Sequence, residues 1–513
     1  MLKRATDLIV LANREPYRHE RDRRGELVTT RCSSGVVNAV EPLLMAHSGV
    51  WVGEGIGDDD RRAAATRDGL NVPVDSPRYR LRRVWLTADE RRGYYFGFAN
   101  STLWPLCHRT AVEPVFYADD FRTYELVNRR FADAVAEEAS SRAPVVLVQD
   151  YHFALAPALI RRQLPLSRIS TFWHIPWPRP ETFSICPWNR ALLEGLLGST
   201  SIGMQTGTDR MNFLAAAAQL PGAEVDVPAC AVIYKGRRVS VGVFPASVVW
   251  DPADDEQPSA TECRASVRRE LGLAAETRIG VGVDRLDYTK GIEHKFLAIE
   301  RLLERKPSLS GQFVFVQLAE PSRECIRAYQ LTRERIVETA ARVNSRFGAG
   351  DWQPIRLLEA HHSSATVARF LRAADVCYVG SLHDGMNLVG KEFVREREDE
   401  RGALVLSTFA GAAQELTDAL LVNPYDVDAA ATAFDRALHM PPTEQRDRLR
   451  RMRATVSRND ASQWARSILE SVMPAEAPIV ERARSPIAAA LAPLAPMDQL
   501  SYPPLAASDA SVS

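Results

Sequence analysis

Cysteine patterns typical of disulfide frameworks or zinc sites are missing from this sequence of 513 residues. The cysteines are odd in number, widely spaced and never arranged as C-x-x-C. The seven are Cys32, Cys107, Cys186, Cys230, Cys263, Cys325 and Cys377. Because paired or clustered cysteines are the usual signature of both kinds of site, we expect neither here, and we predict a protein of the reducing cytoplasm.

Long apolar runs are also missing. No segment approaches the roughly 20 apolar residues that a membrane-spanning helix requires. The run LIVLA at 8–12 is too short for the core of a signal peptide and leads directly into Asn-Arg-Glu-Pro. We therefore expect a soluble protein without a membrane partner, and we interpret LIVLA as the first buried strand.

Charge of one sign is not in excess. Lys and Arg number 64 against 65 Asp and Glu, and 25% of residues are charged while 46% are hydrophobic. This balance is typical of a globular protein that acts on small molecules, and it predicts no nucleic-acid partner. The length exceeds one ordinary core, so two domains are expected, and a homo-oligomer remains open.

Short apolar runs alternate with helix-like segments along most of the chain. Predicted strands cover 7–13, 144–150, 169–176, 200–206, 277–284, 312–319, 376–381 and 402–409. Predicted helices cover 124–139, 153–164, 292–307 and 363–375. In the first of these helices, Leu126, Phe131 and Val135 recur near helical spacing. The alternation predicts an α/β fold of parallel sheets covered by helices.

A Pro- and acid-rich segment without periodicity, 251–262, divides this pattern in two. We predict one Rossmann-like domain over 1–255 and a second over 262–478, with its last helix packed back on the first domain. The Ala-, Pro- and Ser-rich residues 479–513 are predicted to be a disordered tail. Since ligands bind at the carboxyl ends of parallel strands, two facing domains place the active site in the cleft between them.

Charged and polar residues gather just after the predicted strands. They are Arg14, Asp150, His152, His174, Arg285, Lys290, Arg323 and Asp384. A single loop charge is usually only solvated. A set at the same end of both sheets instead predicts a functional rim, because loops at strand carboxyl ends carry the chemistry of α/β folds.

The segment VGVDRLDYTKGI, 281–292, has the features of an anion site. The planar fork of Arg285 suits two phosphate oxygens, and Lys290 adds a mobile point charge. Gly291 lets the chain turn into a helix whose N-terminus also favours an anion. We interpret Arg285 and Lys290 as a diphosphate clamp, with Asp284 and Asp287 bracing the turn.

The segment HDGMNLVGKEF, 383–393, follows another strand and leads into a predicted helix. Asp384 offers a carboxylate, and the backbone N–H groups behind it suit sugar hydroxyls and a phosphate. Glu392, one turn later, is placed to take a diol such as ribose. A solvated surface Glu is the alternative interpretation of that residue.

Three other motifs indicate little chemistry. GEGIG at 53–57 lacks the third Gly and the helix of a dinucleotide motif, so we expect a flexible loop. Asp58, Asp59 and Asp60 are expected to be a solvated charge run. His361 and His362 lack a third ligand at helical spacing. No metal site and no cofactor are therefore predicted.

Six segments resemble the signatures of the trehalose-6-phosphate synthase family. They are VGVDRLDYTKGI, HDGMNLVGKEFV, LSTFAGAAQEL, VQDYHFALAP, FWHIPWPRPETF and YYFGFANSTLWPLCH. The resemblance covers about residues 7–475 and implies two facing Rossmann-like domains, the GT-B architecture. It implies an N-terminal domain that binds the acceptor and a C-terminal one that binds the nucleotide sugar. The implied reaction moves glucose from UDP-glucose to glucose 6-phosphate with retention, giving α,α-trehalose 6-phosphate and UDP.

The resemblance also sorts residues between donor and acceptor. The implied donor set is Arg285 and Lys290 on the diphosphate, Gly35 beside it, His174 on the glucose, Glu392 on the ribose, and Asp384, Gly385, Met386, Asn387, Leu388 and Val389 on the glucose hydroxyls and phosphate. The implied acceptor set is Arg14, Tyr95, Trp104 and Arg323, with Asp150 near the reacting sugar. Arg285, Lys290, His174 and Asp150 form the implied catalytic set.

Family members retain the anomeric configuration without an obvious nucleophile. In agreement, no carboxylate pair in the sequence stands out for the double displacement of retaining hydrolases. We therefore expect attack on the face that the UDP leaves, with the leaving phosphate oxygen accepting the proton of the acceptor hydroxyl. Arg285 and Lys290 would stabilise the growing negative charge.

Two departures from the family pattern concern the acceptor side. Ser34 stands before Gly35 where the family has Gly-Gly, and Glu54 stands where the family commonly has a Trp lining the acceptor pocket. A carboxylate there would repel a sugar phosphate unless it turned toward hydroxyls or an Arg. The opening NREPY also resembles glucosylglycerol-phosphate synthases, which makes glycerol 3-phosphate the alternative acceptor. A catalytically silent regulatory relative is a third hypothesis, which the retained donor residues argue against.

Overall fold

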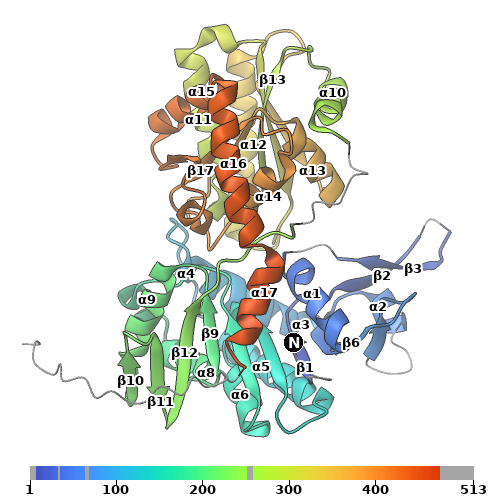
Figure 1. Ribbon diagram of the computed structural model, residues 1–513, viewed down its shortest axis with the longest axis vertical. Coiled ribbons are helices and arrows are strands. Elements are labelled where there is room, and N and C mark those ends of the chain that lie inside the picture. The colour runs from blue at the N-terminus through green and yellow to red at the C-terminus, as the bar shows by residue number, and fades with distance from the viewer. Residues whose placement is uncertain (1–6, 23, 33–34, 64–68, 251–257, 474–513) are drawn as a thin grey trace, which may run out of the picture. The chain divides into compact units, whose positions relative to one another are not determined.

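The structure, a computed structural model, describes residues 7–22, 24–32, 35–63, 69–250 and 258–473 (Figure 1). It contains a ten-stranded sheet, a six-stranded sheet and a two-stranded hairpin, with helices packed around both large sheets. The predicted α/β fold is thereby confirmed. Both sheets lie in one compact unit, Met1–Met473. The predicted tail and most of the predicted linker lie outside the described residues, so the domain boundaries remain predictions.

The larger sheet follows the order β10-β11-β12-β9-β8-β7-β1-β4-β6-β5. Its strands are β1 (Leu8–Leu11), β4 (Val50–Gly55), β5 (Gly69–Val72), β6 (Tyr79–Trp85), β7 (Val145–Gln149), β8 (Arg168–Phe172), β9 (Ser201–Met204), β10 (Ala223–Asp226), β11 (Ala231–Tyr234) and β12 (Arg237–Val243). Neighbours from β12 through β6 are parallel, and the outer strands are antiparallel. The strand β1 is buried along its length, as expected for a parallel strand covered on both faces.

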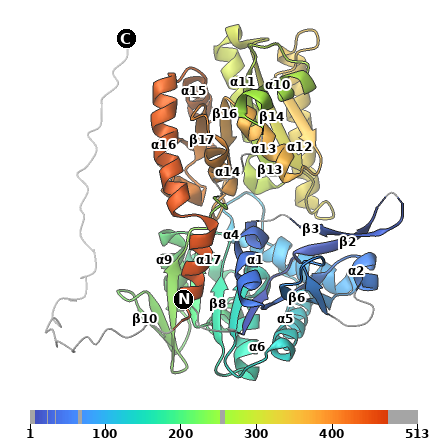
Figure 2. The same cartoon turned by 45° about the vertical axis from the view of Figure 1, so that its right-hand side comes forward.

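Short helices and turns connect these strands. They are α1 (Gly35–His47), α2 (Asp58–Ala63), α3 (Ala88–Arg91), the π-helix η1 (Arg92–Leu103), α4 (Trp104–Cys107), α5 (Ala118–Glu138), η2 (Tyr151–Phe153), α6 (Ala156–Gln163), α7 (Pro180–Ser184), α8 (Asn189–Leu196) and α9 (Gly207–Ala217). The last helix, α17 (Ala461–Glu470), packs against α1 and β8 (Figures 1 and 2). Trp464 on α17 packs its ring edge-on against Phe172 and donates to the carbonyl of Phe244 at 3.1 Å.

The six-stranded sheet is parallel throughout, in the order β15-β14-β13-β16-β17-β18. Its strands are β13 (Arg278–Arg285), β14 (Phe313–Glu320), β15 (Ile355–Glu359), β16 (Val376–Val379), β17 (Ala403–Ser407) and β18 (Leu420–Val422). Side chains of β14 alternate between two hydrophobic clusters. Phe313 and Phe315 belong to one cluster, and Val314 and Val316 to the other, because successive strand residues point to opposite faces.

Helices supply the other half of each cluster. They are α10 (Ala260–Glu270), η3 (Tyr288–Lys290), α11 (Ile292–Arg305), η4 (Pro307–Leu309), α12 (Arg327–Phe347), α13 (Ser364–Ala373), α14 (Leu388–Glu396), η5 (Gly411–Gln414), α15 (Val427–Leu438) and α16 (Pro442–Arg458). Phe296 of α11 and Phe434 of α15 pack with the Phe residues of β14, while α10 and α13 pack with its Val residues. Within the described ranges, no helix is both long and apolar enough to cross a bilayer.

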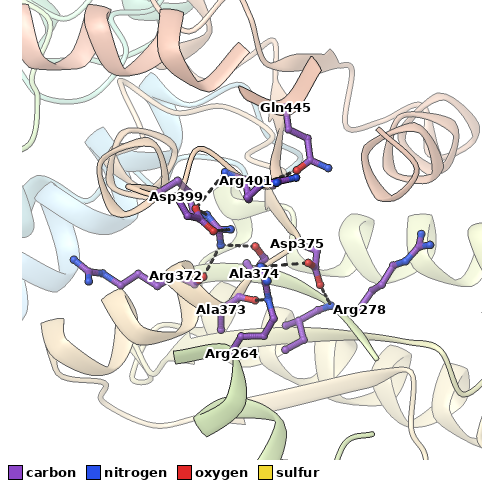
Figure 3. A network of polar contacts seen from close by, with 12 residues as sticks. Arg264, Arg278, Arg372, Ala373, Ala374, Asp375, Asp399, Arg401 and Gln445 are labelled. Carbon is purple, nitrogen blue, oxygen red and sulfur yellow. Dashed lines mark hydrogen bonds and ion pairs between the residues drawn. The ribbon is translucent and has the colours of Figure 1, made fainter. Parts of the chain in front are cut away.

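A network of polar contacts that includes Arg372, Ala374 and Asp399 lies between the ends of α13 and α14 (Figure 3). Arg397 is fully buried and donates to the carbonyls of Arg372 and Ala374 at 2.5 and 2.6 Å. The Asp399 carboxylate accepts from its Nε and Nη2 at 3.0 and 2.9 Å. Because carbonyls at a helix C-terminus lack partners within the helix, this cation stabilises the end of α13 and the start of β16.

Three expectations about local structure are wrong. Leu126 is 49% exposed, because the buried stripe of α5 runs through Tyr124, Val127 and Phe131 instead. The segment GEGIG is not a flexible loop, since its first three residues end the buried strand β4. The acidic run at 58–60 is not wholly solvated, because Asp60 is 1% exposed.

Candidate active site

A cavity of about 430 Å³ opens at the carboxyl ends of both parallel sheets. Its lining includes the residues that follow β1, β7, β8 and β13, together with residues near the start of α14. In the larger sheet, β1 lies between β4 and β7, and in the smaller one β13 lies between β14 and β16. The strand order reverses at both places, and such reversals are where open α/β sheets leave room for ligands.

Eleven of the predicted site residues line this cavity. They are Arg14, Gly35, Tyr95, Trp104, Asp150, His174, Arg285, Lys290, Arg323, Asp384 and Leu388. They come from separate stretches of sequence, so the fold brings the predicted donor and acceptor sets into one space. Their individual roles remain predictions.

The turn after β13 fixes Arg285 through a buried carboxylate. Asp287 is fully buried and accepts from the N–H and hydroxyl of Thr289, each at 3.0 Å. Its other oxygen lies 3.6 Å from Arg285 Nη2 and 3.4 Å from Arg323 Nη1. Burial alone would raise the pKa of Asp287, but these guanidinium groups hold it below its usual value. Asp287 therefore braces the turn, as predicted.

Lys290 forms a close ion pair across the cavity wall. Its Nζ lies 2.5 Å from Asp384 Oδ2. The same oxygen accepts from Ser381 Oγ and from Asn387 Nδ2, both at 3.2 Å. Burial would raise the pKa of Asp384, but the ammonium group of Lys290 outweighs it and lowers that pKa. Asp384 is therefore an anion that orients Lys290.

Aromatic rings and a guanidinium form another wall. Arg323 lies 4.3 Å from the ring centroid of Trp104 and donates to Tyr151 Oη at 3.3 Å. Tyr95 stacks on His152 at 5.7 Å between ring centroids. Burial would raise the pKa of Tyr95, but Arg323 and Arg14 lower it below the usual value. The ring of Trp104 shields Arg323 on one side, which strengthens its attraction for an anion in the cavity.

Asp150 lies at the end of β7 in a backbone conformation that only Gly adopts easily, with φ 74° and ψ 172°. Its Oδ1 accepts from the N–H groups of Tyr151 and His174 at 2.9 and 3.1 Å. Burial nevertheless raises the pKa of Asp150 to about 7. Burial also lowers the pKa of His174 to about 3, so its imidazole is neutral and hydrogen-bonds Gln149 Oε1 at 2.9 Å.

Five residues of the predicted donor set are not among those that line the cavity. They are Gly385, Met386, Asn387, Val389 and Glu392. Met386 is 4% exposed and belongs to the core, and Asn387 caps α14 by accepting from Val389 N at 3.1 Å. A Cβ on Gly385 would lie 2.1 Å from the carbonyl oxygen of His174. The backbone of this segment therefore runs directly against the loop after β8.

Glu54 does not reach the cavity. It is 2% exposed and accepts from Arg91 Nε at 2.6 Å. The expectation that it stands in the acceptor pocket is therefore wrong, because the carboxylate turns toward Arg91 at the end of α3. Ser34, the other departure, lies outside the described residues.

Sequence reasoning missed several lining residues: Trp51, Gln149, Tyr151, Ser247 and Trp464. Gln149 and Tyr151 flank Asp150. The rule that residues at the carboxyl ends of parallel strands form the site, which located Asp150, could therefore also have identified them. Trp464 lies on α17, far along the chain, and no local signal marks it. Five lining residues carry a buried polar atom without a partner in the described part of the chain: Trp104 Nε1, Gln149 Nε2, His152 Nε2, Ser247 Oγ and Arg323 Nε. Buried polar atoms normally have partners, so these point to a polar ligand.

The charges of the cavity suit anionic ligands. Four cationic side chains line it, Arg14, Arg285, Lys290 and Arg323, against the carboxylates of Asp150 and Asp384. Guanidinium and ammonium groups bind phosphate oxygens, and the indole and imidazole groups suit sugar hydroxyls. Within the described ranges, no three His, Cys, Asp or Glu side chains gather to hold a metal ion. The prediction that the site needs no metal remains a prediction.

Comparisons with known proteins agree with this geometry. The model of glycosyltransferase family 20 matches residues 6–473. A protein of Mycobacterium sp. (strain KMS) named trehalose-6-phosphate synthase is 39% identical over 476 residues, covering 91% of this chain and 95% of its own. An E. coli structure bound with UDP-2-fluoro glucose is 30% identical, with a TM-score of 0.79 over 91% of this chain and 98% of its own. The UDP-forming alpha,alpha-trehalose-phosphate synthase of Burkholderia xenovorans in complex with glucose-6-phosphate is 29% identical, with a TM-score of 0.78 over 91% and 99%.

Proposed function

Because this chain belongs to glycosyltransferase family 20, we propose that it transfers glucose from UDP-glucose to glucose 6-phosphate with retention. The products are α,α-trehalose 6-phosphate and UDP. Two relatives named trehalose-6-phosphate synthase match this chain over 95% and 92% of their own lengths. A related structure holds a UDP-glucose analogue and another holds glucose 6-phosphate.

One observation carries the proposal: a single cavity holds two groups of cations. Arg285 ends β13 and Lys290 lies in the turn after it, while Arg14 follows β1 and Arg323 follows β14. Two phosphorylated substrates need two such groups, since each brings its own negative charge. Arg285 also lies 5.4 Å from the Trp104 ring centroid, so the two groups border one another. In our proposal, the diphosphate binds to the first group and the sugar phosphate to the second.

The proposed chemistry is front-face displacement. The bond between the anomeric carbon and the UDP oxygen breaks as the acceptor hydroxyl oxygen bonds to the same carbon on the same face. The leaving phosphate oxygen takes the hydroxyl proton, so no protein nucleophile is required. Arg285 and Lys290 stabilise the charge that grows on the diphosphate, and Asp384 keeps Lys290 oriented at 2.5 Å.

Asp150 and His174 take supporting roles in this proposal. Neutral His174 donates its N–H from Nε2 to Gln149 Oε1, so its Nδ1 can accept from a sugar hydroxyl. Asp150 accepts hydroxyl hydrogens from the acceptor sugar and is itself held by two backbone N–H groups. We also propose that transfer needs no metal ion, since guanidinium and ammonium groups already supply positive charge. The rate in EDTA should then equal the rate without it.

The deciding experiment measures UDP release from UDP-glucose with no acceptor, with glucose 6-phosphate and with glycerol 3-phosphate. Release that depends on glucose 6-phosphate supports the proposal, and identification of the disaccharide phosphate and its anomeric configuration completes it. Preference for glycerol 3-phosphate would establish the alternative acceptor. No release with either acceptor would indicate a silent relative. Repeating the assay with ADP- and GDP-glucose defines the nucleotide.

The clamp itself is tested by Arg285→Ala. Removing one group that stabilises developing charge typically costs about 2.7–4 kcal/mol of barrier, or roughly 100- to 1,000-fold in turnover. Near-normal turnover would show that Arg285 does not contact the leaving group. Arg335→Ala, on the exposed face of α12, serves as the control for loss of an Arg.

We infer a cytoplasmic location and small-molecule partners for this chain. All seven cysteines are free thiols, including the exposed Cys325, which supports a reducing compartment. The balanced charge supports the absence of a nucleic-acid partner. Size-exclusion chromatography with light scattering would determine whether a homo-oligomer forms.

A further inference from the structure

A β-hairpin connects the two sides of the cavity. Its strands are β2 (Tyr17–Arg21) and β3 (Leu27–Arg31), paired antiparallel from Tyr17 opposite Arg31 to Arg21 opposite Leu27. It extends away from the larger sheet (Figure 2). Arg14 precedes one strand and Gly35 follows the other, and both residues line the cavity. We call the segment that begins at Arg14 the first foot of the hairpin and the segment that leads to Gly35 the second foot, or donor foot. The first foot therefore reaches the proposed acceptor side of the cavity and the second foot reaches the donor side.

Arg14 depends on its backbone for its position. Its guanidinium forms no hydrogen bond or ion pair with the described ranges of the chain. The carbonyl oxygen of Arg14 accepts from Trp51 Nε1 at 3.0 Å. A flexible, exposed side chain of this kind is placed only as well as the residues next to it. Those residues, Glu15 to Tyr17, are held by one buried cation.

That cation is Arg83 on β6, which is 2% exposed. Its Nε donates to Glu15 Oε2 at 2.5 Å, and its Nη2 donates to the carbonyl of Tyr17 at 3.0 Å. Nη2 also lies 3.0 Å from Asp60 Oδ1. The same Asp60 oxygen accepts from the backbone N–H of His19 at 2.7 Å. Arg83 thus ties residues 15, 17 and 19 of the first foot to the sheet and to α2.

The second foot has an anchor of its own. Glu41 on α1 is 1% exposed; its Oε2 accepts from Arg31 Nε and its Oε1 from Tyr79 Oη, each at 2.8 Å. Because Arg31 ends β3 and α1 begins at Gly35, this pair fixes the donor foot. The two feet are bonded to each other at their base, where the N–H of Cys32 donates to the carbonyl of Pro16 at 2.8 Å. Burial and Glu41 together raise the pKa of the Tyr17 hydroxyl, so Glu41 also lies close to the first foot. The anchors therefore differ in which foot they hold directly, Arg83 the first and Glu41 the second.

We propose that Arg83 is a positioning residue for the acceptor, holding the first foot of the hairpin so that Arg14 meets the sugar phosphate, while Glu41 holds the second foot for the donor. The assignment of the two sides rests on the proposed function. Displacing a binding group by about 1 Å can cost 100-fold in rate. Loss of Arg83 should thus act mainly on the acceptor, because Arg83 bonds the residues next to Arg14. Loss of Glu41 should act mainly on the donor and less on the acceptor, because Glu41 holds Arg31 and also lies close to Tyr17.

The test compares Arg83→Met with Glu41→Gln in the UDP-release assay, with each substrate varied in turn. We expect Arg83→Met to raise KM for glucose 6-phosphate by about tenfold or more and to leave KM for UDP-glucose within about twofold. Glu41→Gln should raise KM for UDP-glucose more than KM for glucose 6-phosphate, which it reaches only through Tyr17. Arg83→Lys keeps the charge but not the fork, so its KM should lie between those of wild type and Arg83→Met.

A merely structural role predicts something else, namely fewer active molecules, with kcat reduced and both KM values unchanged. That result, or equal rises in both KM values, would overturn the proposal. If Arg83→Met does not fold, Glu15→Leu removes the acceptor for Arg83 Nε beside Arg14, and the same selective rise is expected.

Calorimetric binding of glucose 6-phosphate and of UDP separates this inference from the proposed function. If wild type transfers no glucose, the proposed function fails on its own. A selective loss of glucose 6-phosphate affinity in Arg83→Met still supports the inference. Equal loss for both ligands, no loss, or no glucose 6-phosphate binding by wild type would contradict it.

Discussion

Asp150→Asn is expected to stabilise the fold while it damages turnover. Burial raises the pKa of Asp150 from 3.8 to about 7, so the folded protein holds a proton that the unfolded chain has already lost at neutral pH. An ionised carboxylate at this position therefore opposes folding. Asn keeps the acceptor oxygen for the two N–H groups, and the backbone strain at φ 74° is the same for Asn as for Asp.

The magnitude follows from the same pKa values. Below pH 3.8 Asp150 is protonated in both the folded and the unfolded protein and does not change the free energy of unfolding. As pH rises from 3.8 toward 7, Asp150 lowers the free energy of unfolding by an increasing amount, which is constant above pH 7. At about 1.4 kcal/mol per pKa unit, the full difference is on the order of 4 kcal/mol. Since 21% of the side chain remains exposed, we expect a gain of about 1–3 kcal/mol at pH 8. The gain at pH 5 should be about one third to one half of that.

Urea denaturation at pH 5 and pH 8 measures this difference, with Asp133→Asn on the exposed face of α5 as the surface control. An equal change in unfolding free energy at both pH values would refute the reasoning, because only a titrating carboxylate produces the pH dependence. Turnover of the same variant should fall if the carboxylate contacts the acceptor. A stabilised but impaired variant is the usual sign of a group kept for function.

Two further predictions concern the walls of the cavity. Gly385→Ala should lower turnover by about tenfold or more, since its Cβ would lie 2.1 Å from the carbonyl oxygen of His174 and must displace the loop; Gly207→Ala, with no atom within 4 Å of the new Cβ, is the matched control, and equal effects of the two would contradict this. Glu54→Gln should not lower the unfolding free energy at neutral pH, because burial raises the pKa of Glu54 even beside Arg91, so its ionised form opposes folding. Its KM for glucose 6-phosphate should stay unchanged, and a tenfold rise would mean that Glu54 reaches the acceptor after all.

Much of the fold was predictable because its signals are local. Apolar runs such as LIVLA and the strand before Arg285 are buried on both faces, and parallel strands leave that pattern. The helix over 292–307 was also predictable, since Ile292, Phe296, Ile299 and Leu303 all face the core. On α5, Phe131 and Val135 are buried as predicted, but Leu126 is exposed and its neighbour Val127 is buried, because the two differ in position on the helix and not in hydrophobicity.

The sequence by itself determined which side chains follow the strands, and so which groups meet at the rim. These features could be predicted because a strand end and the charged turn after it can both be recognised in a short run of consecutive residues. Only the tertiary structure decided which way a side chain turns and what holds it. Glu54 points to Arg91 and not to the cavity, Asp60 is buried against Arg83, and Trp464 arrives from the last helix. These outcomes depend on contacts between residues far apart in the chain, for which no stretch of sequence carries a local signal.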